Sequence, residues 1–253
     1  MNAAVPTESA PSPPRPAGRR AAPAPAADRS RASVLWYRMV QWFFSTLLAA
    51  TYSLRATGRE NLPESGAVML VSNHLSHLDV LVLGILLRRP LNYVARSTLF
   101  FPPLGLFIRS LGAFPIQRDG IGAQGLKETL KRLKSGGIVT LFPEGTRTED
   151  GDLGEMKAGI ALLATRAKVA IVPAAVAGTF EAWPKTRFFP VPHPLRVHFG
   201  DLIPAEQVVS MSGDDLNALI RTRVLECQRI ARRGIARDLD LPETAVGDPD
   251  DLV

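Results

Sequence analysis

Short apolar runs alternate with helix-like periodic segments through the middle of the chain. The apolar runs, which have the length and composition of buried strands, occupy residues 67–71, 91–95, 138–142, 170–176 and 195–199. The helix-like segments lie at residues 79–87, 125–134, 158–166 and 214–233. Strands that alternate with helices favour a mostly parallel or mixed sheet with helices on its faces. The pattern therefore predicts an α/β fold.

A longer apolar segment precedes this region, at residues 34–54. Sixteen consecutive residues from Met39 to Leu54 carry no charge. As a helix they would be about 24 Å long, shorter than the roughly 30 Å hydrocarbon core of a bilayer. Aromatic and cationic side chains typical of membrane interfaces lie within this segment and at its ends: Trp36, Tyr37, Arg38, Trp42 and Arg55. We expect a membrane-associated helix that lies in one leaflet, with a tilted single span as the second alternative and a buried soluble helix as the third.

The two ends of the chain differ from the middle in composition. Residues 1–33 are rich in Pro, Ala, Ser and Arg without apolar periodicity, and residues 237–253 are acidic. Both compositions are typical of disorder. The predicted organisation is a disordered extension at 1–33, a membrane-associated helical segment at 34–57, an α/β domain at 58–236 and a disordered acidic tail at 237–253.

The positive charge is concentrated in the middle of the chain. The formal net charge is +6, but the tails carry +3 and −5, so residues 34–236 carry +8. Such an excess suits an anionic membrane or a phosphorylated substrate. Nucleic acid would fit the charge too, but the chain has no aromatic-basic motif and no zinc-ligand spacing to support it. We therefore expect lipid partners and no nucleic acid.

Candidate catalytic residues follow the first predicted strand of the domain. His74 and Asp79 lie five residues apart, and Ser76 with Asp79 has the spacing of a helix cap followed by an acidic residue. His74 would then precede the helix, and the Asp79 carboxylate could fold back onto one imidazole nitrogen. The other nitrogen would remain available as a general base. The alternative is that Asp79 only caps the helix and His74 fills a turn.

A second candidate segment follows the strand at 138–142. Pro143 and Gly145 end the strand, because proline lacks a ladder donor and glycine permits a left-handed turn. Glu144 and Arg147 are then displayed at the carboxyl end of a strand, the usual ligand side of an open α/β sheet. A guanidinium in that position can bind phosphate through two N–H groups. A surface Glu–Arg pair in a turn is the alternative.

The stretch between these two segments is apolar with widely spaced arginines. Residues 96–118 carry Arg96, Arg109 and Arg118 among leucines, phenylalanines and prolines. An apolar wall with cationic points fits a lipid that has a phosphate headgroup. Ordinary core packing with solvated arginines is the alternative.

Taken together, these segments resemble the glycerolipid acyltransferase family, in particular its 1-acylglycerol-3-phosphate acyltransferases, over residues 55–205. Four blocks occur in the family's order. They are Asn73-His74 with Asp79, a middle block ending at Arg118, Phe142-Pro143-Glu144-Gly145-Thr146-Arg147 followed by Lys157-x-Gly159, and Val172-Pro173-Ala174-Ala175-Val176-Ala177-Gly178-Thr179. Four blocks in order are much stronger evidence than any one of them.

The resemblance implies an enzyme that transfers a fatty acyl group from acyl-CoA or acyl carrier protein to the free hydroxyl of 1-acylglycerol 3-phosphate, giving phosphatidic acid. It implies that His74, oriented by Asp79, is the general base, with no covalent acyl-enzyme, no cofactor and no metal. It assigns the acceptor's phosphate region to Arg147, Glu144, Arg118 and Arg96. It assigns donor-side or structural roles to Asn73, Gly145, Thr146 and Pro173. The expected location is the cytoplasmic face of a membrane.

Two departures from the family pattern fall in the acceptor-side block. Members often have Lys-x-Glu-Leu where this chain has Arg96-Ser97-Thr98-Leu99, and Asp where it has Gln117. These departures leave open the same chemistry on another acceptor, such as a lyso-ornithine lipid, another lysophospholipid or glycerol 3-phosphate. A non-catalytic lipid-binding module is the alternative from a different class of protein.

Overall fold

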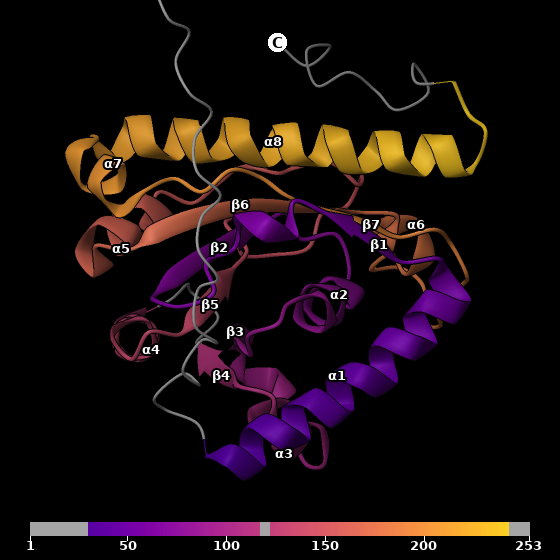
Figure 1. The fold of residues 1–253 in the computed structure, drawn as a ribbon, viewed down its shortest axis with the longest axis horizontal. Coiled ribbons are helices and arrows are strands. Elements are labelled where there is room, and N and C mark those ends of the chain that lie inside the picture. Colours follow the sequence, from indigo (N-terminus) through magenta and orange to yellow (C-terminus); the bar gives the residue numbers. More distant parts are fainter. Residues whose placement is uncertain (1–29, 117–121, 243–253) are drawn as a thin grey trace, which may run out of the picture.

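The computed structural model describes residues 30–116 and 122–242 and contains one seven-stranded sheet between two layers of helices (Figure 1). The strand order is β1-β7-β6-β2-β5-β3-β4. Neighbouring strands are parallel except for the antiparallel pair of β6 and β7. The strands are β1 (Arg55–Thr57), β2 (Val68–Ser72), β3 (Leu91–Arg96), β4 (Ala113–Ile116), β5 (Ile138–Leu141), β6 (Ala170–Ala177) and β7 (Arg196–Phe199). The predicted mixed α/β sheet is confirmed.

Helices cover both faces of this sheet. Helices α1 and α2 lie on one face and α8 lies on the other, together with α4, α5 and α7 (Figure 1). The helices are α1 (Arg31–Tyr52), α2 (Leu78–Leu86), α3 (Leu104–Ser110), α4 (Gly122–Lys134), α5 (Gly159–Ala167), α6 (Thr179–Ala182), α7 (Ala205–Ser210) and α8 (Gly213–Asp238), with 3-10 turns at Arg59–Asn61 and Ser97–Leu99.

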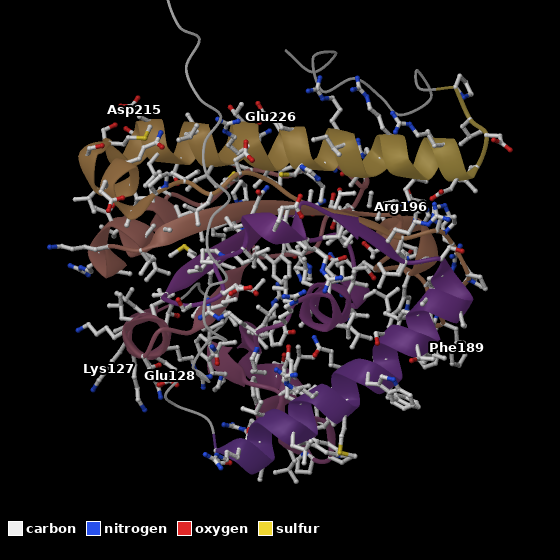
Figure 2. All side chains as sticks on the ribbon, viewed as in Figure 1. Lys127, Glu128, Phe189, Arg196, Asp215 and Glu226 are labelled. Carbon is white, nitrogen blue, oxygen red and sulfur yellow. The ribbon has the colours of Figure 1, made fainter. Side chains whose placement is uncertain are left out.

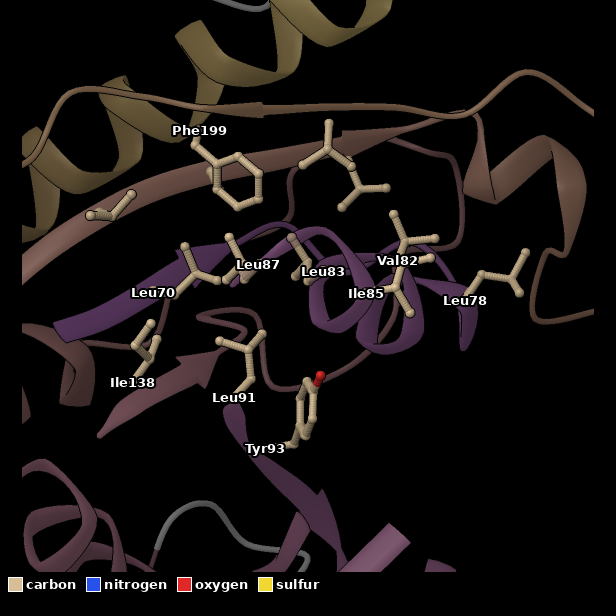
Figure 3. Packing of buried hydrophobic residues seen from close by; sticks show 14 of the residues in the cluster. Leu70, Leu78, Val82, Leu83, Ile85, Leu87, Leu91, Tyr93, Ile138 and Phe199 are labelled. Carbon is tan, nitrogen blue, oxygen red and sulfur yellow. The ribbon is translucent and has the colours of Figure 1, made fainter. Parts of the chain in front are cut away.

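The central strand β2 is buried on both of its faces. Leu70 packs with Leu83 of α2 and with Phe199 in one core cluster (Figure 3), while Met69 and Val71 belong to the cluster under α8. All five residues of the strand are buried. A parallel strand that is covered on both faces has no polar side, so its sequence cannot alternate.

Two strands were not predicted from the sequence. Strand β1 is only three residues long, and it pairs with β7, so residues 55–57 belong to the sheet and not to the membrane-associated segment predicted at 34–57. Strand β4 contains Pro115, which argues against a central strand. It lies at the edge of the sheet, where a proline without an N–H donor is tolerated.

The predicted boundaries of the tails also shift. Helix α1 begins at Arg31, inside the predicted extension, and residues 1–29 lie outside the described part. Helix α8 continues to Asp238, inside the predicted acidic tail, of which residues 243–253 lie outside the described part. Asp238 pairs with Arg196 of β7 (labelled in Figure 2) and with Arg55 of β1, so the helix end is tied to the edge of the sheet.

Helix α1 has two faces with different environments. One face packs on α2, where the Gln41 amide donates to the carbonyl oxygens of Gly84, Ile85 and Leu87 over 2.5–3.1 Å. The opposite face exposes large apolar side chains: Leu35, Met39, Trp42, Phe43 and Leu47. No helix within residues 30–116 and 122–242 is long and apolar enough to cross a membrane.

Candidate active site

The two candidate segments meet at the carboxyl ends of adjacent parallel strands. Strands β2 and β5 pair in register from Val68 with Ile138 to Val71 with Leu141, so the loops that follow them start side by side. The backbone N–H of Thr148 donates to the His74 carbonyl oxygen over 2.9 Å, which joins the two loops directly. The two loops are therefore neighbours at the carboxyl ends of β2 and β5.

His74 and Asp79 form a hydrogen-bonded pair. Nδ1 of His74 lies 2.9 Å from Oδ2 of Asp79, and the aspartate side chain is fully buried. The same oxygen accepts from the backbone N–H groups of Leu75 at 2.6 Å and Ser76 at 2.7 Å. The carboxylate thus folds back on the loop as expected, and these donors fix its position.

The start of α2 differs slightly from the prediction. The helix begins at Leu78 and its cap position is His77, one residue later than the Ser76 cap expected from the spacing. Ser76 still contributes, because its hydroxyl oxygen accepts from the Leu78 N–H at 3.2 Å and its O–H donates to the Trp183 carbonyl at 2.8 Å. Ser76 thus stabilises the start of α2, while Asp79 binds backbone N–H groups in the loop before the helix.

The imidazole of His74 is held against an aromatic ring. Its ring stacks on Phe142, with centroids 4.0 Å apart and an angle of 16° between the planes. The side chain is 17% exposed. Among the described residues, no hydrogen bond occupies Nε2. A ring that is fixed through Nδ1 and by stacking, with Nε2 unoccupied, is oriented to accept a proton from a bound hydroxyl.

Glu144 has a different environment from the one predicted. Its Oε1 accepts the His74 backbone N–H at 2.8 Å and its Oε2 accepts the Gly154 N–H at 3.2 Å, with 7% of the residue exposed. Burial raises the pKa of Glu144 above its ordinary value, and these two hydrogen bonds oppose that effect. This carboxylate therefore holds two backbone loops together, and its expected role in the acceptor's phosphate region stays a prediction.

Arg147 interacts electrostatically with Asp79 of the dyad and with a second arginine, Arg96. Burial lowers the pKa of its guanidinium; Asp79 raises that pKa and Arg96 lowers it, which places both side chains within electrostatic range of Arg147. The pKa of nearby His77 is lowered by burial, by Arg147 and by His74, with Asp79 opposing. In the described ranges neither Arg96 nor Arg147 forms an ion pair. Arg96 and Arg147 thus provide positive charge close to the His74–Asp79 dyad.

The other predicted residues are placed as follows. The Asn73 amide is buried and pairs twice with the backbone of Val176 in β6, at 2.9 and 2.8 Å, which is a structural role. Gly145 has φ +69° and its turn is closed by a hydrogen bond from its N–H to the Phe142 carbonyl at 3.1 Å. Thr146 is exposed in the same loop. Arg118 and Gln117 lie outside the described residues.

Pro173 is buried within β6. Its ring lies beside Gly200, with Cys227 of α8 at its carbonyl oxygen. This is the α8 side of the sheet, away from the stacked His74 and Phe142. The packing agrees with the structural alternative of the two roles expected for this residue, and the donor-side alternative stays a prediction.

Two residues near the dyad were quoted in the motifs without a role. Thr179, in the fourth block, donates from its hydroxyl to Oδ1 of Asp79 at 2.6 Å. Lys157 extends its Nζ beside Gly145, to 2.9 Å from where a Cβ on that glycine would lie. Both come from distant parts of the sequence, and the signal that marks them is their membership in the family blocks.

Comparison with known proteins shows which family the chain is similar to. A family model described as Acyltransferase matches residues 53–177. A protein named 1-acyl-sn-glycerol-3-phosphate acyltransferase from Bacillus subtilis (strain 168) is 32% identical over 144 residues, which cover 56% of this chain and 71% of the relative. The chain belongs to the glycerolipid acyltransferase family. The dyad, Glu144 and Arg147 all lie inside the matched region.

Further relatives extend the comparison. The chloroplastic 1-acyl-sn-glycerol-3-phosphate acyltransferase LPAT1 of Arabidopsis thaliana is 36% identical over 137 residues, which cover 53% of this chain but only 38% of LPAT1. The crystal structure of the 1-acyl-sn-glycerophosphate (LPA) acyltransferase PlsC from Thermotoga maritima has a TM-score of 0.68 to this acyltransferase, covering 85% of this chain and 84% of that chain at 22% identity. The two share their fold.

Proposed function

We propose that this acyltransferase transfers a fatty acyl group from an acyl thioester, either acyl-CoA or acyl carrier protein, to the free hydroxyl of 1-acylglycerol 3-phosphate. The product is phosphatidic acid. The observation that carries this proposal is the His74–Asp79 pair beside Arg96 and Arg147, which form no ion pair among the described residues. A base and a positive cluster within one site suit a substrate that carries both a hydroxyl and a phosphate. The relatives from Bacillus subtilis and Arabidopsis thaliana are named for this acceptor, which supports the proposal.

In the proposed mechanism, Nε2 of His74 removes the proton of the acceptor hydroxyl while its oxygen attacks the thioester carbonyl carbon. The tetrahedral intermediate then collapses, the carbon–sulfur bond breaks, and the thiolate leaves with the proton returned by His74. Asp79 stabilises the imidazolium that forms between these steps, because its carboxylate oxygen Oδ2 lies 2.9 Å from Nδ1. No covalent acyl-enzyme, cofactor or metal takes part.

Arg147 and Arg96 hold the acceptor phosphate in this proposal. A lysophospholipid phosphate carries up to two negative charges. Two guanidiniums that have no carboxylate partner in the described part of the chain offer several N–H donors to it. Arg147 is partly buried, which strengthens its interaction with an anion relative to a fully solvated side chain. Lys157 lies on the same loop and adds a further cation near Gly145.

The acceptor reaches the site from a bilayer surface. The exposed apolar face of α1 continues onto α3, because the Trp36 indole N–H donates to the Ser110 hydroxyl at 2.9 Å. Phe101 and Leu106 at α3, and Phe188 and Phe189 before β7, are also exposed; Figure 2 shows Phe189 at the periphery of the molecule. We call these exposed residues of 35–47, 101–107 and 188–189 the outer apolar surface. We propose that it attaches the enzyme to the cytoplasmic face of the membrane without spanning it.

Thiol release from acyl-CoA by the purified protein tests the reaction, with lysophosphatidic acid as acceptor and product mass spectrometry as the readout. The His74→Ala variant should lose at least about 100-fold in kcat, as expected when a general base is removed. Turnover like that of the wild type in this variant would refute the mechanism. A panel of lyso-ornithine lipid, other lysophospholipids and glycerol 3-phosphate identifies the acceptor. Lipid binding without turnover on any acceptor would point to a non-catalytic module.

A further inference from the structure

The two oxygens of the Asp79 carboxylate have unequal sets of partners. Oδ2 accepts from His74 Nδ1 and from two backbone N–H groups. Oδ1 accepts from one group among the described residues, the Thr179 hydroxyl at 2.6 Å. Both Asp79 and Thr179 are fully buried, so solvent does not replace this donor. The environment of Oδ1 therefore depends on a residue that lies 100 positions later in the chain.

The backbone holds Thr179 firmly in place. Thr179 is the first residue of α6, directly after β6, and its carbonyl oxygen accepts the Trp183 N–H at 2.9 Å. The preceding Gly178 has φ +84°, and a Cβ there would clash with the carbonyl oxygen of Pro194. Two residues before Gly178, the backbone of Val176 is bound on both sides by the Asn73 amide. The segment from Asn73 to Asp79 and the segment from Val176 to Thr179 are thus linked at two points.

We propose that Thr179 is a positioning residue for acyl transfer, acting on His74 through Asp79. Its hydroxyl keeps Oδ1 hydrogen-bonded and so holds the carboxylate in the rotation that presents Oδ2 to Nδ1. Without this donor, a buried anionic oxygen has no partner, and the carboxylate must rotate, take up a proton or draw in water. Each of these responses weakens the orientation of the imidazole. The inference rests on the proposed role of His74 as the base.

Removal of the hydroxyl at constant shape tests the proposal. In the purified full chain, Thr179→Val should lower kcat about 10- to 100-fold, in the range set by general-base catalysis, while KM for the thioester and the acceptor stays within about twofold. Thr140→Val is the matched control. Thr140 is a buried threonine in β5, and its Oγ1 has no hydrogen-bond partner among the described residues. It should retain the wild-type kcat. A wild-type kcat in Thr179→Val, or a loss confined to KM, would overturn the proposal.

A second pair of variants covers the case in which valine prevents folding. Thr179→Ser and Thr179→Ala both lack the γ-methyl group and differ only in the hydroxyl. The serine variant should retain at least about one third of kcat and the alanine variant should show the 10- to 100-fold loss. Equal activity in the two would show that the hydroxyl has no role.

A double-mutant cycle separates action through Asp79 from an independent effect. In an Asp79→Asn background, Thr179→Val should change kcat by less than about threefold, because the carboxylate it positions is already absent. A loss as large as in the wild-type background would contradict the proposal. If His74→Ala keeps full turnover, the proposed base is wrong; if it is inactive while Thr179→Val is normal, only this inference fails.

Discussion

The backbone N–H of His74 donates to Oε1 of Glu144 over 2.8 Å, so the residue that carries the proposed base is held by a carboxylate from the neighbouring loop. The other oxygen of Glu144 binds the N–H of Gly154, whose carbonyl oxygen accepts from Arg221 of α8 at 2.9 Å. Helix α8 also holds this loop through Gln228 and Arg232, which both donate to the Gly151 carbonyl. The position of His74 therefore depends on a helix on the opposite face of the sheet.

Substitution of Glu144 should affect turnover more than acceptor binding. Glu144→Gln keeps an oxygen for the His74 N–H but presents an NH₂ group to the Gly154 N–H, so one buried bond is lost. We expect a destabilisation of about 1–3 kcal/mol in urea unfolding and a lower kcat with KM for lysophosphatidic acid almost unchanged. A selective increase in that KM would instead support direct contact with the acceptor.

Substitution of Arg147 should show the opposite kinetic pattern. Arg147→Ala removes a charged donor from the proposed phosphate site, a change of about 1.5–3 kcal/mol, or roughly 10- to 100-fold in KM for the acceptor. KM for acyl-CoA should change little. Arg166→Ala on α5 is the control, because Arg166 is exposed and its side chain forms no hydrogen bond or ion pair among the described residues. Its kinetics should match the wild type. Steady-state assays with each substrate varied in turn distinguish these outcomes.

The contact between α1 and α2 should contribute measurably to stability. In Gln41→Ala, carbonyl groups at the end of α2 lose a shared donor, which should cost about 1–3 kcal/mol. Gln207→Ala removes an exposed glutamine on α7 and should stay within about 0.5 kcal/mol of the wild type. Chemical unfolding in matched detergent measures both. Equal stabilities would mean that α1 is attached mainly by its apolar contacts.

The outer apolar surface should determine membrane attachment. Replacing Trp42 and Phe43 together by serine removes two of its largest exposed side chains, 71% and 57% exposed. Because burial of a large apolar side chain contributes about 1.5–3 kcal/mol, the partition onto anionic vesicles should weaken by at least about tenfold. Leu162→Ser on α5, 61% exposed on the other face, is the control for general surface polarity. Vesicle flotation measures both, and equal flotation would refute this assignment.

The single cysteine should be unreactive while the protein is folded. Cys227 is 2% exposed, and burial raises the pKa of its thiol to about 12 from an ordinary 9.0. At pH 8 the thiolate fraction is therefore very small, and alkylation should be at least about 100-fold slower than in the unfolded chain. Mass spectrometry after timed iodoacetamide treatment, with and without guanidinium, measures this ratio. Rapid modification of the folded enzyme would contradict the buried position.

The sequence by itself determined the features that depend on local pattern. The strands at 67–71, 138–142 and 170–176, and the loops that follow them, could be predicted because apolar runs and chain-breaking residues such as Pro143 and Gly145 act within a few positions. The fold-back of Asp79 onto His74 could be predicted as well, because only five positions separate them. The family blocks then identified the chemistry.

Only the tertiary structure decided which distant groups meet at the site. Strand order places β5 on one side of β2 and β6 on the other, and this brings Glu144 to the His74 backbone and Thr179 to Asp79. Alternation along β6 turns Pro173 to the α8 side, while its neighbours Val172 and Ala174 pack in the cluster on the other face. No local pattern carries this information, because a side chain's hydrogen-bond partner is set by which strands are neighbours and by which face it occupies.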